Sequence, residues 1–173
     1  MPRPSVGDEV TADYLDRLTY FPVTQLEQQA AQTVASAVDE AVDFGSSSEI
    51  FDDENWHDVS TNNQRITPNI EGRYYVHFHG TWTGINPEIL ILTSSYIRKN
   101  GSTVVSRSGG YKPSVTSTSA LMIPSVETYV DMNGTTDYLE AVLAQTSGGS
   151  ATRDTNNSST GRCTFIVVLH RRA

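Results

Sequence analysis

The stretch Cys163-Thr-Phe-Ile-Val-Val-Leu-His170 decides the fold predicted for this chain. Successive side chains of an extended strand point to opposite faces, so the odd-numbered residues from Cys163 to Leu169 share one apolar face. Ile166 and Val168 make the opposite face apolar as well. Only one face of a strand meets the core of an antiparallel sandwich, so the second face needs another partner, of which the simplest is a second copy of the chain.

The segments upstream of this stretch also have the pattern of strands. Asp137 to Gln145 forms a second apolar run, which a loop rich in Ser, Thr, Gly and Asn separates from Cys163. Arg73 to Thr83 alternates strictly between apolar and polar residues, as a half-buried antiparallel strand does. The apolar face of that strand is expected to carry Tyr74, Val76, Phe78 and Trp82.

Turn signals divide the middle of the chain into further strands. Asn100-Gly101 is a strong hairpin signal between a strand over Glu88 to Lys99 and a return strand that begins at Thr103. We expect Gly109-Gly110 to end that return strand, and further strands over Thr116 to Ile123 and Val126 to Met132. Strands at this spacing, joined by polar turns, predict an all-β antiparallel jelly-roll sandwich rather than an α/β enzyme.

The N-terminal segments are less regular. Residues 1–22 form a predicted arm, in which Thr11 is a candidate N-cap of a small helix that ends near Leu18. The apolar residues of this arm need a surface to cover them, which predicts a docking element; they are Val10, Tyr14, Leu15 and Leu18. Thr24 to Phe44 favours a helix by its Ala, Gln and Glu content.

Composition excludes several classes of function. The chain has 173 residues, which suits one domain of residues 23–173 plus the arm, and its net charge of −8 argues against nucleic acid as a partner. It has no run of membrane-spanning length and no apolar segment behind the N-terminus like that of a secretory signal. The single cysteine, Cys163, excludes an internal disulfide and a cysteine-rich zinc site.

Two clusters raise the question of metal binding. His77 and His79 lie on the polar face of one predicted strand, as a metal-binding jelly-roll enzyme would require, but no acid follows until Glu88 and the only later histidine is His170. Carboxylates gather over residues 49–58 without the spacing of a calcium loop. We therefore expect two polar-face histidines and a solvated acidic loop, with no catalytic residue, no metal site and no cofactor.

Three segments resemble a known family of proteins. They are the leader Pro4 to Leu15, the segment Arg65-Ile-Thr-Pro-Asn-Ile-Glu-Gly-Arg-Tyr-Tyr-Val76 with the acidic loop before it, and Tyr129 to His170. Together they resemble bacteriophage structural proteins that carry a jelly roll similar to tumour necrosis factor and the complement globular head. In that family the segment from Thr24 to Phe44 supplies the first strands, so the resemblance predicts strand there from about Gln25.

The resemblance implies a function. It implies a homotrimer and a non-enzymatic virion protein, assembled in the bacterial cytoplasm, that decorates and stabilises the capsid through its N-terminal arm. The predicted trimer interface comprises Ile89, Ile91, Phe165, Ile166 and Val168. A minor tail protein, a tail-tip or fibre head that binds a host surface glycan, is the alternative. A metal-dependent jelly-roll enzyme that uses His77 and His79 is a third reading.

Overall fold

The computed structural model describes residues 20–45, 48–83, 91–112, 125–146, 153–155 and 161–172. These residues form β-strands and turns, with no helix among them. The strands are β1 (Val23–Glu27), β2 (Thr33–Val34), β3 (Asp39–Ala41), β4 (Glu49–Asp52), β5 (Arg65–Ile66), β6 (Glu71–His79), β7 (Trp82–Thr83), β8 (Ile91–Lys99), β9 (Thr103–Lys112), β10 (Ser125–Asn133), β11 (Leu139–Thr146), β12 (Arg153–Thr155) and β13 (Thr164–Arg172). The all-β prediction is confirmed. The predicted arm helix and the strand over Thr116 to Ile123 lie outside the described residues.

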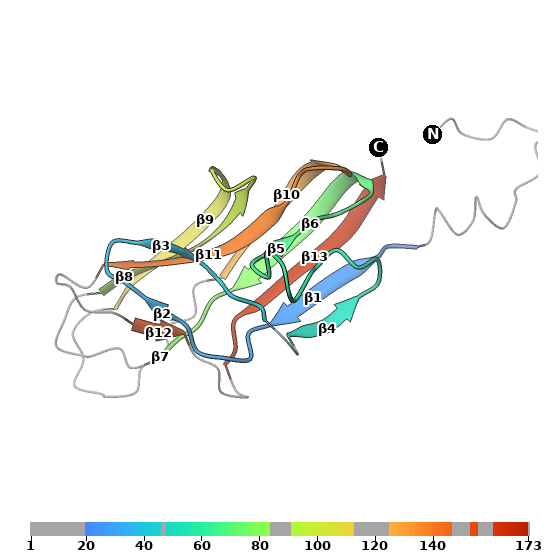
Figure 1. Cartoon of the computed structure of the whole chain (residues 1–173). Helices are drawn as coiled ribbons and strands as arrows, with labels where there is room; N and C mark the ends of the chain where they lie inside the picture. Colours follow the sequence, from blue (N-terminus) through green and yellow to red (C-terminus); the bar gives the residue numbers. More distant parts are fainter. Residues whose placement is uncertain are drawn as a thin grey trace, which may run out of the picture.

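The strands form two larger antiparallel sheets, which Figure 1 shows as two layers. The first sheet has the order β10-β6-β13-β1-β4, so the last strand of the chain lies between β6 and β1. The second has the order β3-β11-β8-β9, with β5 also paired to β11, and a small sheet has the order β2-β12-β7. The two apolar runs of the sequence, Asp137 to Gln145 and Cys163 to His170, correspond to β11 and β13 and therefore belong to different sheets.

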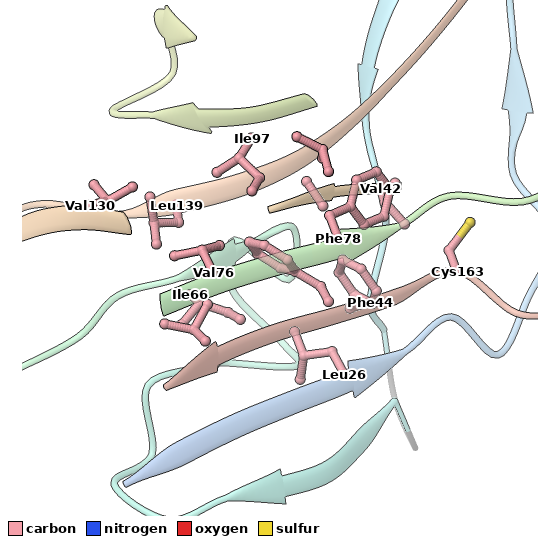
Figure 2. Packing of buried hydrophobic residues seen from close by; sticks show 14 of the residues in the cluster. Leu26, Val42, Phe44, Ile66, Val76, Phe78, Ile97, Val130, Leu139 and Cys163 are labelled. Atoms are coloured by element: carbon pink, nitrogen blue, oxygen red, sulfur yellow. The ribbon is translucent and has the colours of Figure 1, made fainter. Parts of the chain in front are cut away.

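The core lies between the two larger sheets, where apolar side chains from both converge (Figure 2). Strand β6 buries Tyr74, Val76 and Phe78, as its alternating pattern predicts. Phe165 of β13 stacks on Phe44, and their ring centroids are 6.1 Å apart. Phe165 also meets the ring of Phe78 edge to face. Alternation on each strand thus supplies one wall of the core.

The segment from Thr24 to Phe44 contains strands, not a helix. It forms β1, β2 and β3, which pair with β13, β12 and β11 respectively. A left-handed residue, Ala37 with φ 61°, separates β2 from β3. The turn leaves Val38 40% exposed, although Val34 and Val42 are buried.

Two features of the predicted strands need correction. Gly109-Gly110 does not end the return strand, because β9 continues to Lys112 and pairs both glycines with β8. Trp82 does not extend β6, which stops at His79; it belongs to β7 in the small sheet and is fully buried. In both places pairing with a neighbouring strand decides where the strand lies.

The predicted hairpin at Asn100-Gly101 is confirmed. Asn100 and Gly101 have φ values of 54° and 72°, as both central residues of a type I′ turn require. The turn is tied to a second one, since Asn100 donates to Asp137 over 2.8 Å and its side-chain oxygen accepts from the backbone of Tyr138. These contacts fix one end of the second sheet.

Candidate functional site

The outer face of the five-stranded sheet is the candidate functional site. Side chains on this face point away from the core and fall into rows that cross the strands. One row runs through β10, β6, β13 and β1, because the strand register places these residues directly opposite one another: Tyr129, Tyr75, Val168 and Val23. Among the described strands, no second sheet covers this row.

The aromatic side chains at one end of this row pack on one another. Tyr75 and Tyr129 lie 5.6 Å apart between ring centroids, and His170 meets Tyr129 edge to face at 5.0 Å. Tyr129 is nevertheless 56% exposed. The hydroxyl of Tyr75 donates to Glu127 over 2.5 Å, and this hydrogen bond, together with burial, raises the pKa of Tyr75 to about 12. The rings are therefore held in place by contacts within the sheet while the outer ring faces solvent.

A second row extends the face across the whole sheet. It runs from Glu127 through His77, Ile166 and Gln25 to Phe51 on the edge strand β4. Phe51 is 54% exposed. The face thus carries exposed or half-exposed apolar groups on β10, β13 and β4.

The residues of the predicted trimer interface differ in whether their side chains lie on the outer face or in the core. Ile166 and Val168 lie on the outer face and are half-buried, as expected. Phe165 is fully buried inside a single chain, so its side chain is not available to a neighbouring copy, and its assignment to the interface was wrong. The side chain of Ile91 is not among those described, and Ile89 lies outside the described residues.

His77 and His79 lie on this same outer face. The Nε2 atom of His77 is 2.8 Å from the hydroxyl of Ser125. Burial, and then the charge of His77, lower the pKa of His79. Within the described ranges no group of three or more His, Cys, Asp and Glu side chains could hold a metal ion. The pair by itself supplies too few ligands for a protein metal site.

The acidic loop uses its carboxylates in internal hydrogen bonds. Asp52 accepts from the Thr24 hydroxyl at 2.7 Å and from the backbone of Trp56 at 2.9 Å. The buried ring of His57 places Nδ1 2.8 Å from Glu49. The cluster therefore holds β4 against β1 and against the loop that follows, rather than forming an open ring of oxygen ligands.

The four docking residues of the predicted arm, Val10, Tyr14, Leu15 and Leu18, lie outside the described residues. At the point where the described chain begins, Tyr20 is 41% exposed and Phe21 is 53% exposed. In the part of the chain that the structure describes, no helix is long and apolar enough to cross a membrane.

Sequence reasoning missed the most exposed part of the outer face. It recognised two apolar faces in the stretch before His170 but did not place Tyr75 and Tyr129 beside them. A signal was present, since Tyr75 stands on the polar face of a strictly alternating strand, where an aromatic residue is unexpected. The position of Tyr129 depends on the pairing of β10 with β6, which no local pattern gives.

Comparison with known proteins bears on the fold. No family model matches the chain, and no curated protein matches it by sequence. Several solved structures do match the chain. One is an Eiger TNF from S. frugiperda, which matches with a TM-score of 0.58 and 10% identity, over 88% of this chain and 94% of that one. Murine APRIL at pH 5.0 matches with a TM-score of 0.59 and 10% identity, over 87% of this chain and 99% of that one. The chain therefore has a jelly-roll fold similar to that of TNF.

Proposed function

We propose that this chain is a non-enzymatic structural protein that assembles as a homotrimer through the outer face of its five-stranded sheet. The observation that carries the proposal is the row of Tyr129, Tyr75 and Val168 on a face that no second sheet covers in the part of the chain that the structure describes. Exposed apolar surface that is built from ordered side chains is typical of a protein interface. The jelly roll similar to that of TNF supports the same reading, because the family resemblance of the sequence implies a non-enzymatic homotrimer with this fold.

The acidic balance of the chain supports assembly through apolar contact. With a net charge of −8, identical chains repel one another over most of their surface. The rows that contain Tyr75, Ile166 and Val168 hold few charges, so bringing copies together there costs least and buries most apolar area. Aromatic residues are also the type most enriched in the energetically important centres of interfaces.

Replacement of Tyr129 by Asp tests the self-association. We expect the wild-type protein to have the mass of a trimer in light scattering after size exclusion at micromolar concentration, and Tyr129→Asp to have the mass of a monomer with an unchanged circular dichroism spectrum. A buried, unpaired carboxylate within the interface is strongly unfavourable, which gives the expected loss of assembly.

Val104→Asp is the matched control. Val104 is 49% exposed on β9 in the other sheet, so the same kind of substitution there should leave the trimer intact. A monomeric wild-type protein contradicts the proposal, and so does a Tyr129→Asp variant that remains trimeric at the same concentration.

For the wider role, we propose that the trimer is a surface knob of a bacteriophage virion, assembled in the cytoplasm of the bacterial host. The resemblance of the leader, of the segment before β6 and of the region from Tyr129 to His170 to phage structural proteins supports this role. Decoration of the capsid through the arm is the version we favour over a tail-tip head, because the apolar residues of the arm, among them Leu15 and Leu18, need a surface to cover them. Electron microscopy of particles that lack this protein distinguishes the capsid from the tail.

A further inference from the structure

A cavity lies where several connecting segments of the chain meet. It has a volume of about 480 Å³, within the range of about 300–1,000 Å³ that small-molecule sites commonly have. Its walls come from the segment between β1 and β2, from the residues after β3 and from the loop between β4 and β5; they include Ala30, Ala31, Gln32, Asp43, Gly45 and Asn63. None of the lining residues belongs to the two rows of the outer face, so they are not part of the proposed trimer interface.

Hydrogen bonds between these segments hold the walls of the cavity in place. The side-chain nitrogen of Gln32 donates to the carbonyl oxygen of Ala41 at 2.8 Å, and its side-chain oxygen accepts from the backbone N–H of Asp43 at 2.9 Å. The backbone N–H of Phe44 donates to the carbonyl oxygen of Asn63 at 3.2 Å. The cavity is therefore formed before a ligand arrives, which lowers the cost of binding.

Gly45 leaves an open space between two polar side chains. A Cβ atom on Gly45 would lie 3.5 Å from Oδ1 of Asp43 and 3.8 Å from Nδ2 of Asn63. These are ordinary van der Waals distances, so that position is free and both polar atoms border it. The carboxylate oxygen accepts hydrogen bonds and the amide nitrogen donates them. A group bound here has to donate to Asp43 and to accept from Asn63.

The polar groups of the walls are not used up by contacts within the chain. Among the described residues, neither the carboxylate of Asp43 nor the side-chain amide of Asn63 makes a hydrogen bond or an ion pair. Ser48 also lines the cavity; it is 1% exposed, and its hydroxyl group has no hydrogen-bond partner in the part of the chain that the structure describes. A buried hydroxyl group without a partner is costly, so such groups are normally satisfied by water or by a ligand.

The charges at the cavity disfavour an ionic ligand. Asp43 is the one charged residue among the lining residues that the structure describes, and the whole chain has a net charge of −8, so an anion is repelled. A metal ion is also disfavoured, because a single carboxylate is too few for a cation site and the Nδ2 donor of Asn63 borders the same space. A neutral hydroxyl group fits, since it both donates and accepts.

We propose that this cavity binds a saccharide, with one of its hydroxyl groups over Gly45 between Asp43 and Asn63. A sugar ring carries several neighbouring hydroxyl groups, which supply the partner that the hydroxyl group of Ser48 lacks. The C–H groups of the ring are apolar, and apolar side chains of the cavity wall give them a surface to pack on; these are Ala30, Ala31 and the 38% exposed Val59.

The direct test is a titration of the full-length, ¹⁵N-labelled protein with the methyl glycosides of glucose, galactose, mannose, rhamnose and N-acetylglucosamine. The side-chain amide signal of Asn63 and the backbone N–H signal of Gly45 are followed. We expect at least one glycoside to shift both signals to saturation, and glycerol at the same concentration of hydroxyl groups not to do so. The proposal is overturned if none of the glycosides gives a saturating shift, or if glycerol gives the same shift.

The glycoside that binds is then compared with a disaccharide of the same sugar. Tighter binding of the disaccharide identifies a glycan chain as the ligand, and equal or weaker binding identifies a single sugar unit; both support the site.

Gly45→Ala fills the space between the two polar atoms and should abolish the saturating shift. The added methyl group makes only ordinary contacts with Asp43 and Asn63, so the fold should not change. Asp43→Asn should weaken binding about tenfold, because a hydrogen bond to a neutral amide oxygen is weaker than one to a carboxylate. Binding of Gly45→Ala with the affinity of the wild type contradicts the site.

Ser48→Ala and Ser95→Ala form a matched pair of variants. Both serines are buried and both hydroxyl groups lack a hydrogen-bond partner among the described residues, but Ser95 lies on β8 and does not line the cavity. Loss of an unsatisfied hydroxyl group should not lower the free energy of unfolding of either variant, whereas only Ser48→Ala should weaken sugar binding, by a few-fold. An equal loss of affinity in the two variants, or none in Ser48→Ala, overturns the assignment of Ser48 to the site.

Discussion

At the scale of the residue, two neighbours on β13 have opposite roles. Phe165 is fully buried and packs against Phe44 and Phe78, whereas Ile166 is half-buried on the outer face. The difference follows from the alternation of side chains along a strand. One step in sequence therefore separates a residue that stabilises the monomer from a residue available for assembly.

Phe165→Ala should lower the free energy of unfolding by about 3–5 kcal/mol, because it removes a large side chain from the core and leaves a cavity. Ile166→Ala should cost the monomer much less, on the order of 1 kcal/mol, since its site is only half-buried. Both are measured by urea denaturation in the Tyr129→Asp background, so that self-association does not contribute. Equal losses for the two variants would contradict the assignment of faces.

At the scale of the element, the turn after β10 shows how side chains replace missing backbone contacts. The side-chain oxygen of Asn133 accepts from the backbone N–H groups of Thr135, Thr136 and Asp137, each at 3.0 Å. Asp137 in turn binds Lys99 at 2.7 Å in the hairpin between β8 and β9. The two turns thus form one polar unit at this end of the sandwich.

This unit should make stability depend on pH. Burial opposes ionisation of Asp137, but hydrogen bonds from Asn100, Lys99 and Asn133 outweigh it and lower the pKa of Asp137 below its ordinary value of 3.8. A carboxyl whose pKa is lower in the folded state contributes stability above the unfolded pKa and loses that contribution as the pH falls through the folded pKa. The folded state is therefore more stable when the carboxyl group of Asp137 is ionised.

Asp137→Asn should cost about 1–3 kcal/mol at pH 7, because it removes the charge that these donors bind. The difference in unfolding free energy between the wild type and Asp137→Asn should shrink as the pH falls below 3.8. Thermal or urea unfolding at pH 7 and pH 3 measures it. A difference that stays constant over this range would show that the charge of Asp137 is not the source of the effect.

At the scale of the whole molecule, assembly and attachment use separate parts of the chain in our proposal. The outer face that carries Tyr129 lies in the five-stranded sheet, and the predicted docking arm is confined to residues 1–22. Three arms on one trimer act together through their effective concentration, so a modest affinity of each arm becomes firm attachment. The two functions should therefore separate by mutation.

Leu15→Asp and Leu18→Asp should leave the protein folded and trimeric but should release it from particles. Each places a charge in the apolar stripe of the arm, three times per trimer, and the predicted jelly-roll domain of residues 23–173 does not include the stripe. Co-sedimentation with particles measures attachment, and light scattering measures the trimer. If a chain shortened to begin at Pro22 still sediments with particles at the wild-type ratio, docking uses the base of the jelly roll instead of the arm.

Local sequence patterns determined some of the strands of this protein and one of its hairpins. Alternation along β6 and β13 specifies which side chains face the core, and Asn100-Gly101 specifies a hairpin, because side-chain direction and positive φ are properties of a few consecutive residues. The second apolar face of β13 likewise indicated a surface that needs a partner. These predictions require no knowledge of distant contacts.

Tertiary structure decided what depends on distant partners. The segment from Thr24 to Phe44 has the composition of a helix, and Gly109-Gly110 has that of a strand end, yet pairing with β13, β11 and β8 makes both segments strands. The close approach of the last residues of β13 to Gly72 likewise depends on the pairing of β13 with β6. Backbone hydrogen bonds to a neighbouring strand, together with burial between two sheets, outweigh a local propensity of a few tenths of a kcal/mol per residue.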